Sequence, residues 1–296
     1  MNGVILIDKD MDWTSHDVVA KLRGVTRIKK IGHTGTLDPM ATGALPICIG
    51  KATKIVEYLQ ADDKVYIADM VFGSKTDTYD SSGEIVATSS KRISEEELRS
   101  ILPLFTGDIK QLPPMFSAIK VSGVKLYELA RKGIEIEREL RDVNISKLDL
   151  IEFNEKEQTC RIYVHCSSGT YIRSLINDIG EKLSSYANMT SLRRIKCGDF
   201  EIENALTLEQ LSTKELVLAN LIPIDEALKS FQRIDIPHSE YTRITNGMTI
   251  ILKEGFNSYN TDINSLFYCR GEFIGIGTIF DKSEIGCKAK IKKLLL

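Results

Sequence analysis

The segment 32–43 limits the possible folds most, because three glycines and a proline surround a single carboxylate, Asp38. Glycine permits positive φ angles and close approach to the backbone, while Pro39 disfavours the α region for Asp38. We therefore expect a rigid loop that presents one acid, rather than a regular helix or a central strand. The segment matches neither the G-x-x-x-x-G-K-[ST] nor the G-x-G-x-x-G pattern. It holds no second acid for a paired-carboxylate glycosidase site.

Basic residues surround this segment, although the whole chain is slightly acidic. The 296 residues carry a net charge of −2, which argues mildly against a polyanion partner because counterion release requires clustered Lys and Arg. Asp38 is nevertheless the only acid between Lys21 and Lys54. Further basic runs lie at 110–132, 193–196 and 288–293. This distribution is compatible with a nucleic acid partner.

The cysteines and the hydropathy indicate a reducing, aqueous environment. The six cysteines form no C-x-x-C pair, and Cys160 and Cys166 alternate with Ile162 and Val164 in one apolar pattern. That alternation predicts the buried face of a strand. We expect reduced, buried thiols in a cytoplasmic protein, with no metal ligands or disulfides. No stretch resembles a membrane span, and residues 4–7 predict a strand rather than a signal peptide.

Hydrophobic periodicity predicts a chain of mixed strands and helices. The predicted strands are 4–8, 64–73, 141–153 and 158–167, and the predicted helices are about 15–28, 52–59, 94–102, 127–130 and 172–180. Ser15 is the expected cap of the first helix, with Asp17 in its first turn. Residues 111–120 predict an extended segment interrupted by prolines, and short strands and turns follow from about 234.

The string Gly32-His33-Thr34-Gly35-Thr36-Leu37-Asp38-Pro39, followed by Ala41-Thr42-Gly43 and Leu45-Pro46, resembles the signature of the TruB family of tRNA pseudouridine synthases. On local pattern alone, Asp38 would be assigned to a turn, where aspartate is common. The long ungapped match favours a catalytic role instead. Matches to other family segments follow in order at 111–120, 169–173 and 187–194, although Phe116 and Asn188 replace the more usual Tyr and His.

The resemblance implies an α+β fold with a mixed, largely antiparallel sheet flanked by helices. The implied domains are a catalytic domain over 1–233, with an RNA-gripping insertion at about 105–141, and a small β-rich PUA-like RNA-binding domain over 234–296. The implied activity is that of an isomerase, which converts uridine 55 in the TΨC arm of tRNA to pseudouridine. Bonds are exchanged within one nucleotide, so the resemblance implies no cofactor and no metal, and a monomer without an obligate protein partner.

The resemblance also assigns roles to individual residues. Asp38 is the implied catalytic carboxylate, and both a nucleophile at C1′ and a base at C2′ remain open. Arg173 is its implied cationic partner, and Tyr66 is expected to stack on the flipped uracil and to handle the C5 proton. The other implied substrate-binding residues are the pocket walls Tyr171 and Leu192 and the RNA contacts Lys9, His33 and Lys54. Lys9 is alternatively a support for the site.

Three other functions remain open from the sequence. An RNA-binding or RNA-folding protein would suit the basic runs, but it has no need of a buried carboxylate facing an anionic ligand. A guide-RNA-directed synthase acting on ribosomal RNA is the second, and the absence of a long basic extension favours the tRNA enzyme instead. A hydrolase or phosphotransferase would require a metal-binding acid cluster, for which Asp77 and Asp80 are too loose a pattern.

Overall fold

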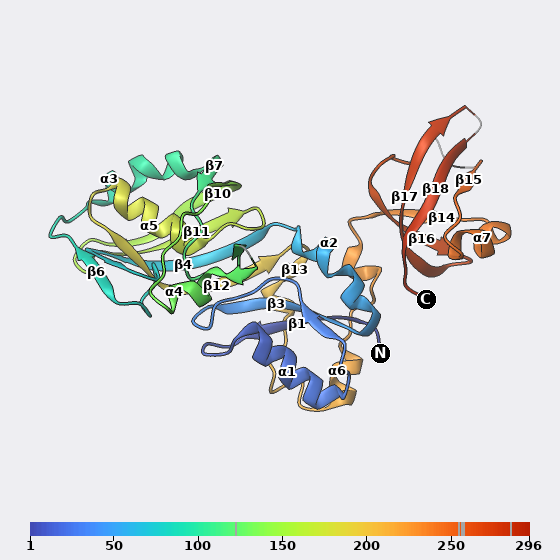
Figure 1. Ribbon diagram of the computed structural model, residues 1–296, viewed down its shortest axis with the longest axis horizontal. Helices are drawn as coiled ribbons and strands as arrows, with labels where there is room; N and C mark the ends of the chain where they lie inside the picture. The colour runs from blue at the N-terminus through green and yellow to red at the C-terminus, as the bar shows by residue number, and fades with distance from the viewer. Residues whose placement is uncertain (122, 254, 256–257, 285) are drawn as a thin grey trace.

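A nine-stranded sheet forms the larger part of the computed structural model, which describes residues 1–296 except 122, 254, 256–257 and 285 (Figure 1). The strand order is β1-β3-β12-β4-β11-β10-β7, with β13 paired to β12 and β2 to β3. Only the pairing of β12 with β3 is parallel, which confirms a mixed, largely antiparallel sheet. The strands are β1 (Gly3–Lys9), β2 (Ile31–His33), β3 (Thr42–Ile49), β4 (Lys64–Phe72), β7 (Gly107–Gln111), β10 (Arg141–Asn154), β11 (Thr159–Cys166), β12 (Ala187–Cys197) and β13 (Phe200–Glu201).

Helices and two small hairpins surround this sheet, except that the last α-helix (Tyr241–Thr245) and the last 3-10 helix (His238–Glu240) lie with the C-terminal strands. The longest helices are α1 and α5, and their apolar residues on the side of the sheet are buried apart from the half-buried Val25. The α-helices are α1 (Ser15–Thr26), α2 (Val56–Gln60), α3 (Glu95–Ile101), α4 (Leu126–Ala130), α5 (Ile172–Lys182), α6 (Lys214–Ala219) and α7 (Tyr241–Thr245). The 3-10 helices are η1 (Gly50–Ile55), η2 (Leu102–Phe105), η3 (Ile202–Asn204), η4 (Glu226–Leu228) and η5 (His238–Glu240). The hairpins pair β5 (Ser74–Thr76) with β6 (Ile85–Thr88) and β8 (Lys120–Val121) with β9 (Val124–Lys125).

Two local predictions around the first helix need correction. The cap of α1 is Thr14, which forms a capping box with Asp17, and not Ser15. In addition, both ends of segment 32–43 lie in strands, because β2 reaches His33 and β3 begins at Thr42. Strand β2 is an edge strand paired only with β3, where glycine is tolerated. The sequence prediction overlooked β3, since Gly43 and Pro46 break its pattern.

The C-terminal residues form a separate five-stranded sheet, as the β-rich pattern predicted (Figure 1). Its order is β14-β16-β17-β18-β15, with β14 parallel to β16. The strands are β14 (Gln232–Asp235), β15 (Ile250–Leu252), β16 (Asn264–Cys269), β17 (Glu272–Ser283) and β18 (Gly286–Leu294). Although this sheet has its own core, a second buried cluster joins Leu6 and Ala44 to Leu266 and Tyr268. The two sheets therefore share apolar packing.

The predicted burial of the cysteines agrees with the structure. All six cysteines are free and buried, and Cys160 and Cys166 lie with Ile162 and Val164 in the core of the large sheet. Burial raises the pKa of the Cys166 thiol to about 11, so this thiol is protonated at neutral pH. In the described part of the chain, no helix combines the length and apolar character needed to cross a membrane.

Candidate active site

The loop that carries Asp38 is pinned from both sides by hydrogen bonds, as expected for a rigid loop. The Leu37 amide donates to the Ser15 hydroxyl at 2.9 Å, and that hydroxyl donates to the Leu37 carbonyl at 3.2 Å. The Ala41 amide donates to the Asp38 carbonyl at 3.0 Å and the Asp12 amide donates to the Pro39 carbonyl at 2.9 Å. Ser15 thus fixes the loop that carries Asp38 rather than capping its helix.

Lys9 supports the same loop through hydrogen bonds to main-chain carbonyls. Its side chain is fully buried, and its ammonium donates to the carbonyls of Asp10 at 2.9 Å, Trp13 at 2.6 Å and Pro39 at 3.3 Å. Burial lowers the pKa of Lys9 to about 8, against the opposing charge of Asp38. With all three ammonium protons taken by carbonyls, the geometry favours the supporting role over a phosphate contact.

Arg173, in the first turn of α5, joins Asp38 to three other groups. Its Nη2 atom lies 3.1 Å from the Asp38 Oδ2 atom and donates to the Phe116 carbonyl at 2.9 Å. Its Nη1 atom lies 3.1 Å from the Asp80 Oδ2 atom and donates to the Thr78 carbonyl at 3.2 Å. The predicted partnership of Asp38 and Arg173 is therefore present, and one guanidinium serves two carboxylates.

Asp80 is a site residue that the sequence reasoning considered only as a weak metal ligand. Its side chain is 4% exposed, and it accepts hydrogen bonds from the Thr78 hydroxyl at 2.8 Å, the Ser82 amide at 3.0 Å and the Ser82 hydroxyl. The Thr/Asp/Ser pattern of residues 76–82 is typical of such side-chain-stabilised turns. That pattern was the available signal, but it does not show that the turn faces Arg173.

The Asp38 carboxylate is accessible from outside although protein surrounds it. Its side chain is 37% exposed, compared with 7% for Arg173. Burial raises the pKa of Asp38, Arg173 and Lys9 oppose this rise, and the Asp80 charge adds to it. A carboxylate whose ionised form is poorly solvated is a stronger base and nucleophile than one in bulk water.

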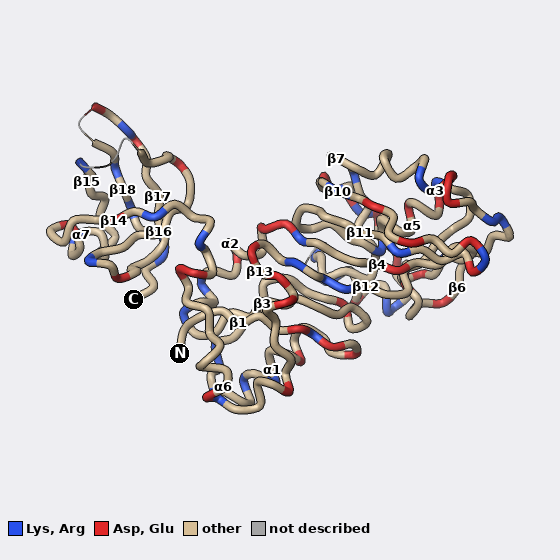
Figure 2. The backbone as a smooth tube through the Cα atoms, turned by 180° about the vertical axis from the view of Figure 1, so that it is seen from behind, with Lys and Arg blue, Asp and Glu red and all other residues tan. Residues whose placement is uncertain are grey.

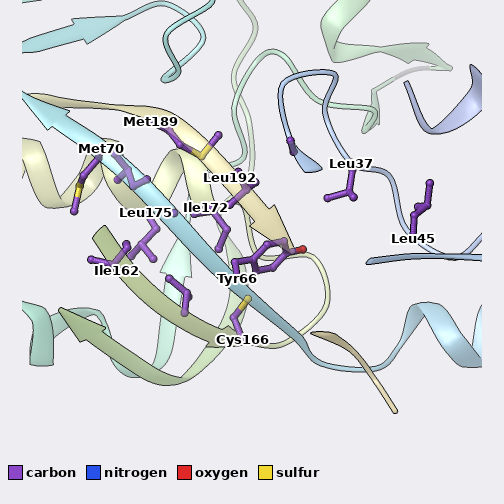
Figure 3. Packing of buried hydrophobic residues seen from close by; sticks show 14 of the residues in the cluster. Leu37, Leu45, Tyr66, Met70, Ile162, Cys166, Ile172, Leu175, Met189 and Leu192 are labelled. Carbon is purple, nitrogen blue, oxygen red and sulfur yellow. The ribbon is translucent and has the colours of Figure 1, made fainter. Parts of the chain in front are cut away.

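Two residues that the resemblance assigns to the base pocket, Tyr66 and Leu192, belong to the same buried cluster as Leu37, the sequence neighbour of Asp38 (Figure 3). Tyr66 in β4 and Leu192 in β12 are 8% and 7% exposed and belong to the main core cluster. In Figure 3 the Tyr66 hydroxyl points away from Met70 and Ile162, toward the side on which Leu37 lies. Burial raises the pKa of Tyr66 to about 12. An apolar cluster that contains an aromatic ring is the kind of surface that binds a planar base.

Tyr171 precedes α5 and is held through its main chain. Its amide donates to the Gln111 side-chain carbonyl at 2.7 Å, and the Gln111 amide group donates back to the Tyr171 carbonyl at 3.0 Å. Burial raises the pKa of the Tyr171 phenol, the Ser117 hydroxyl opposes this rise, and the Asp38 charge contributes to it. Tyr171 is therefore near the carboxylate, as the resemblance implied.

His33 and Lys54 lie in different surroundings. The His33 ring packs edge-on against His16 at 5.3 Å, and its buried Nδ1 atom has no hydrogen-bond partner among the described residues. Burial lowers the pKa of His33 to about 4, so it is neutral at pH 7. Lys54 donates to the Leu294 carbonyl at 2.8 Å, at the junction with the C-terminal sheet, and the structure does not bring it to Asp38.

Two further buried residues were not assigned a role from the sequence. Arg194 belongs to a basic run, yet it is 1% exposed and donates to the carbonyls of Ala44 at 2.7 Å and Gly35 at 3.1 Å. Asn188 is also buried, and its amide group donates to the hydroxyl of Ser74 at 3.0 Å and to its carbonyl at 3.2 Å. Sequence alone contains no signal that separates a buried arginine from an exposed one.

Comparisons with known proteins identify relatives that match nearly the whole chain. "tRNA pseudouridine synthase B" of Clostridium perfringens (strain 13 / Type A) is 43% identical, over 100% of this chain and 99% of that protein. The protein of the same name from Clostridium tetani (strain Massachusetts / E88) is also 43% identical, over 100% of both chains. That of Fusobacterium nucleatum subsp. nucleatum is 44% identical, over 94% of this chain and 96% of that protein.

Solved structures and family models complete the comparison. The "Crystal Structure of a Cbf5-Nop10-Gar1 Complex" matches with a TM-score of 0.75 and 25% identity, over 99% of this chain and 85% of that chain. The family model "TruB family pseudouridylate synthase (N terminal domain)" matches residues 23–172. The model "tRNA pseudouridylate synthase B C-terminal domain" matches residues 173–229. The chain therefore belongs to the TruB family of pseudouridylate synthases.

Proposed function

We propose that this protein is an isomerase that converts uridine 55 in the TΨC arm of tRNA to pseudouridine. The observation that carries the proposal is the accessible Asp38 carboxylate held by Arg173, on a loop whose Leu37 shares a buried cluster with Tyr66 and Leu192. Relatives that share more than two-fifths of their residues with this chain, over nearly all of both chains, carry the name tRNA pseudouridine synthase B. A monomer that needs no partner protein is part of the same proposal.

The proposed reaction uses Asp38 in one of two ways. It attacks C1′ of the ribose as a nucleophile, or it removes a proton from C2′ as a base. Both routes require the ionised carboxylate, which Arg173 stabilises at 3.1 Å while burial keeps it reactive. The uracil then detaches, turns and rejoins the ribose through C5. Reaching the site requires the base to leave its stack, which costs a few kcal/mol.

The insertion is proposed to hold the RNA over this site. The insertion is hydrogen-bonded to α5 near residues 112–116. The Ser174 hydroxyl donates to the Leu112 carbonyl at 2.9 Å, and Arg173 donates to the Phe116 carbonyl. Arg138 donates to the Pro113 carbonyl at 2.9 Å and so closes the insertion on itself. The Phe116 main chain therefore lies beside Arg173, and its half-buried side chain is proposed to contact a flipped nucleotide.

Incubation with an unmodified tRNA transcript tests the proposed function directly. We expect one new pseudouridine at position 55, mapped by chemical labelling of pseudouridine followed by primer extension. A transcript with cytidine at that position is the matched control and should remain unmodified. Pseudouridine at other positions only, or none at all with folded protein, would contradict the proposal.

Exposed lysines on β18 are expected to contribute to tRNA affinity but not to the chemistry. Lys290 and Lys292 alternate with the buried Ala289 and Ile291 and therefore face solvent. Figure 2 marks the Lys and Arg positions of the C-terminal sheet in blue along the backbone. Replacing both by glutamine should weaken tRNA binding and reduce the slope of log K against log salt by about 1 per residue, while turnover at saturating tRNA is retained. Filter binding at several salt concentrations measures this slope.

The control for this prediction is the exposed Lys156, in the turn between β10 and β11. Lys156→Gln should leave the salt slope unchanged, and equal slopes for all variants would refute an RNA-binding role for β18. Point variants are preferable to removing residues 234–296, because the shared cluster of Leu6, Leu266 and Tyr268 would be exposed by truncation. A truncated protein that unfolds would lose tRNA binding for a reason unrelated to the lysines.

A further inference from the structure

Arg194 is a buried cation without a matching anion. Its side chain is among the largest fully buried ones in the protein, and no carboxylate of the described residues lies within ion-pairing distance of it. The adjacent Arg193, by contrast, is partly exposed and pairs with Asp8 at 2.7 Å. A charge removed from water without a partner is costly, so an unpaired buried guanidinium is retained against a stability cost.

The contacts of Arg194 connect the catalytic loop to Tyr66. Its hydrogen bonds to the carbonyls of Gly35 and Ala44 bracket the loop that carries Asp38. The close approach of β3 to β12 requires Gly43, since a Cβ atom there would come within 2.2 Å of the Arg194 carbonyl oxygen. These two bonds use two of five guanidinium N–H groups, which leaves donors for another acceptor.

Tyr66 is the remaining partner of this guanidinium. It is the cross-strand partner of Arg194 in the pairing of β4 with β12, so the two side chains lie on the same face of the sheet. The charge of the neighbouring Arg194 lowers the pKa of Tyr66, against the larger opposing effect of burial. An arginine has no acceptor, so this guanidinium can only donate to the Tyr66 oxygen and leaves the phenol proton free to point elsewhere.

The reaction proposed above needs a group that exchanges two protons. Formation of pseudouridine adds a proton at N1 of uracil and removes one from C5, so the total is unchanged. A tyrosine that gives its phenol proton to N1 becomes a phenolate. When the C5–H bond then breaks, its electron pair restores the C5=C6 double bond and the proton passes to the phenolate oxygen. The tyrosine returns to its starting state, and between the two transfers it requires a nearby cation.

We propose that Arg194 is a positioning residue that acts through Tyr66, as the counter-ion of a transient Tyr66 phenolate during proton exchange between N1 and C5. The proposal rests on the proposed uridine isomerisation. It accounts for a buried guanidinium that lacks a carboxylate among the described residues and faces a tyrosine beside the catalytic loop. The loop contacts to Gly35 and Ala44 are a second, purely structural task of the same side chain.

A deuterium isotope effect separates these two tasks. Single-turnover rates are measured with tRNA transcripts that contain ordinary or C5-deuterated uridine. Arg194→Met should slow conversion about 10- to 100-fold, the range expected for loss of a charge-assisted hydrogen bond, and should raise the isotope effect because C5–H cleavage becomes limiting. Arg194→Lys retains the charge and should keep the isotope effect close to that of the unmodified protein. Arg193→Met, which removes the adjacent arginine, is the matched control and should not change it.

Tyr66→Phe supplies a second, independent comparison. If Arg194 acts through Tyr66, adding Arg194→Met to Tyr66→Phe should cause no further increase in the isotope effect. Two outcomes would overturn the proposal: an unchanged isotope effect in a folded Arg194→Met variant, or independent effects of the two substitutions. If Arg194→Met does not fold, Tyr66→Phe alone tests the proposal. An isotope effect in Tyr66→Phe equal to that of the unmodified protein would then overturn it. Failure of the proposed function is distinguishable, since the unmodified protein would then convert neither transcript.

Discussion

Replacement of Asp38 by asparagine is expected to abolish uridine isomerisation, with a loss of at least about 10³-fold, while tRNA binding changes little. Asparagine has nearly the same shape and can still accept a hydrogen bond from Arg173, which lies 3.1 Å from the carboxylate. It cannot act as a nucleophile at C1′ or as a base at C2′. Release of tritium from tRNA labelled at C5 measures the reaction, and filter binding measures the affinity.

The same substitution should stabilise the folded protein at neutral pH. Burial raises the pKa of Asp38 above its ordinary value of 3.8, so the folded state binds this proton more tightly than the unfolded state. Stability is therefore lost as the pH rises from 3.8 through the folded-state pKa, and asparagine avoids this loss. We expect a higher melting temperature for Asp38→Asn at pH 7, with a difference that disappears as the pH falls toward 3.8.

The control for both expectations is Asp10→Asn, which removes an exposed carboxylate close in sequence. This variant should retain turnover and show no gain in melting temperature at pH 7. Appreciable tritium release by Asp38→Asn would remove Asp38 from the reaction. A lower melting temperature for Asp38→Asn at pH 7 would show instead that its pairing with Arg173 outweighs the cost of burying the charge.

Local patterns in the sequence predicted those parts of the fold that local physics determines. The α5 stripe of Ile172, Leu175, Ile176 and Ile179, the alternation in β11 and the rigid Asp38 loop follow from side-chain spacing and from glycine and proline chemistry. Strand β3 escaped prediction because Pro46 and Gly43 break its alternation, and only its neighbours β1 and β12 reveal why both are tolerated. Local propensity carries no information on such neighbours.

The role of a site residue could be predicted where the residue type limits the possible roles. It could be predicted less well where a contact with a residue far away in the sequence decides the role. Asp38 and Arg173 were found through the family resemblance, and their contact agrees with it. Asp80 was missed because its importance depends on Arg173, which is far away in the sequence. Lys54 stays a prediction: its charge suggests a phosphate contact, and the folded chain adds a hydrogen bond to the Leu294 carbonyl that no local pattern indicates.

Replacement of Arg173 by methionine is expected to have the largest combined effect on stability and turnover of any single substitution in the site. The change leaves Asp38 and Asp80 with no cation between them and removes the donors to the carbonyls of Thr78 and Phe116. Removing one partner of a buried ion pair costs about 3–5 kcal/mol. Most turnover should be lost because Asp38 is no longer oriented, while tRNA affinity should fall less.

A second substitution separates the two effects of losing Arg173. Adding Asp80→Asn to Arg173→Met removes the unpaired buried carboxylate, so part of the unfolding free energy should return, whereas turnover should not. Arg161→Met is the control: its side chain is 47% exposed and it pairs with Asp69 at 2.7 Å on the sheet surface, where an ion pair contributes little. Urea unfolding at pH 7 and single-turnover conversion of tRNA measure the two quantities. Equal stability of the single and double variants would show that the uncompensated Asp80 charge is not the source of the loss, and unchanged turnover in Arg173→Met would remove Arg173 from the site.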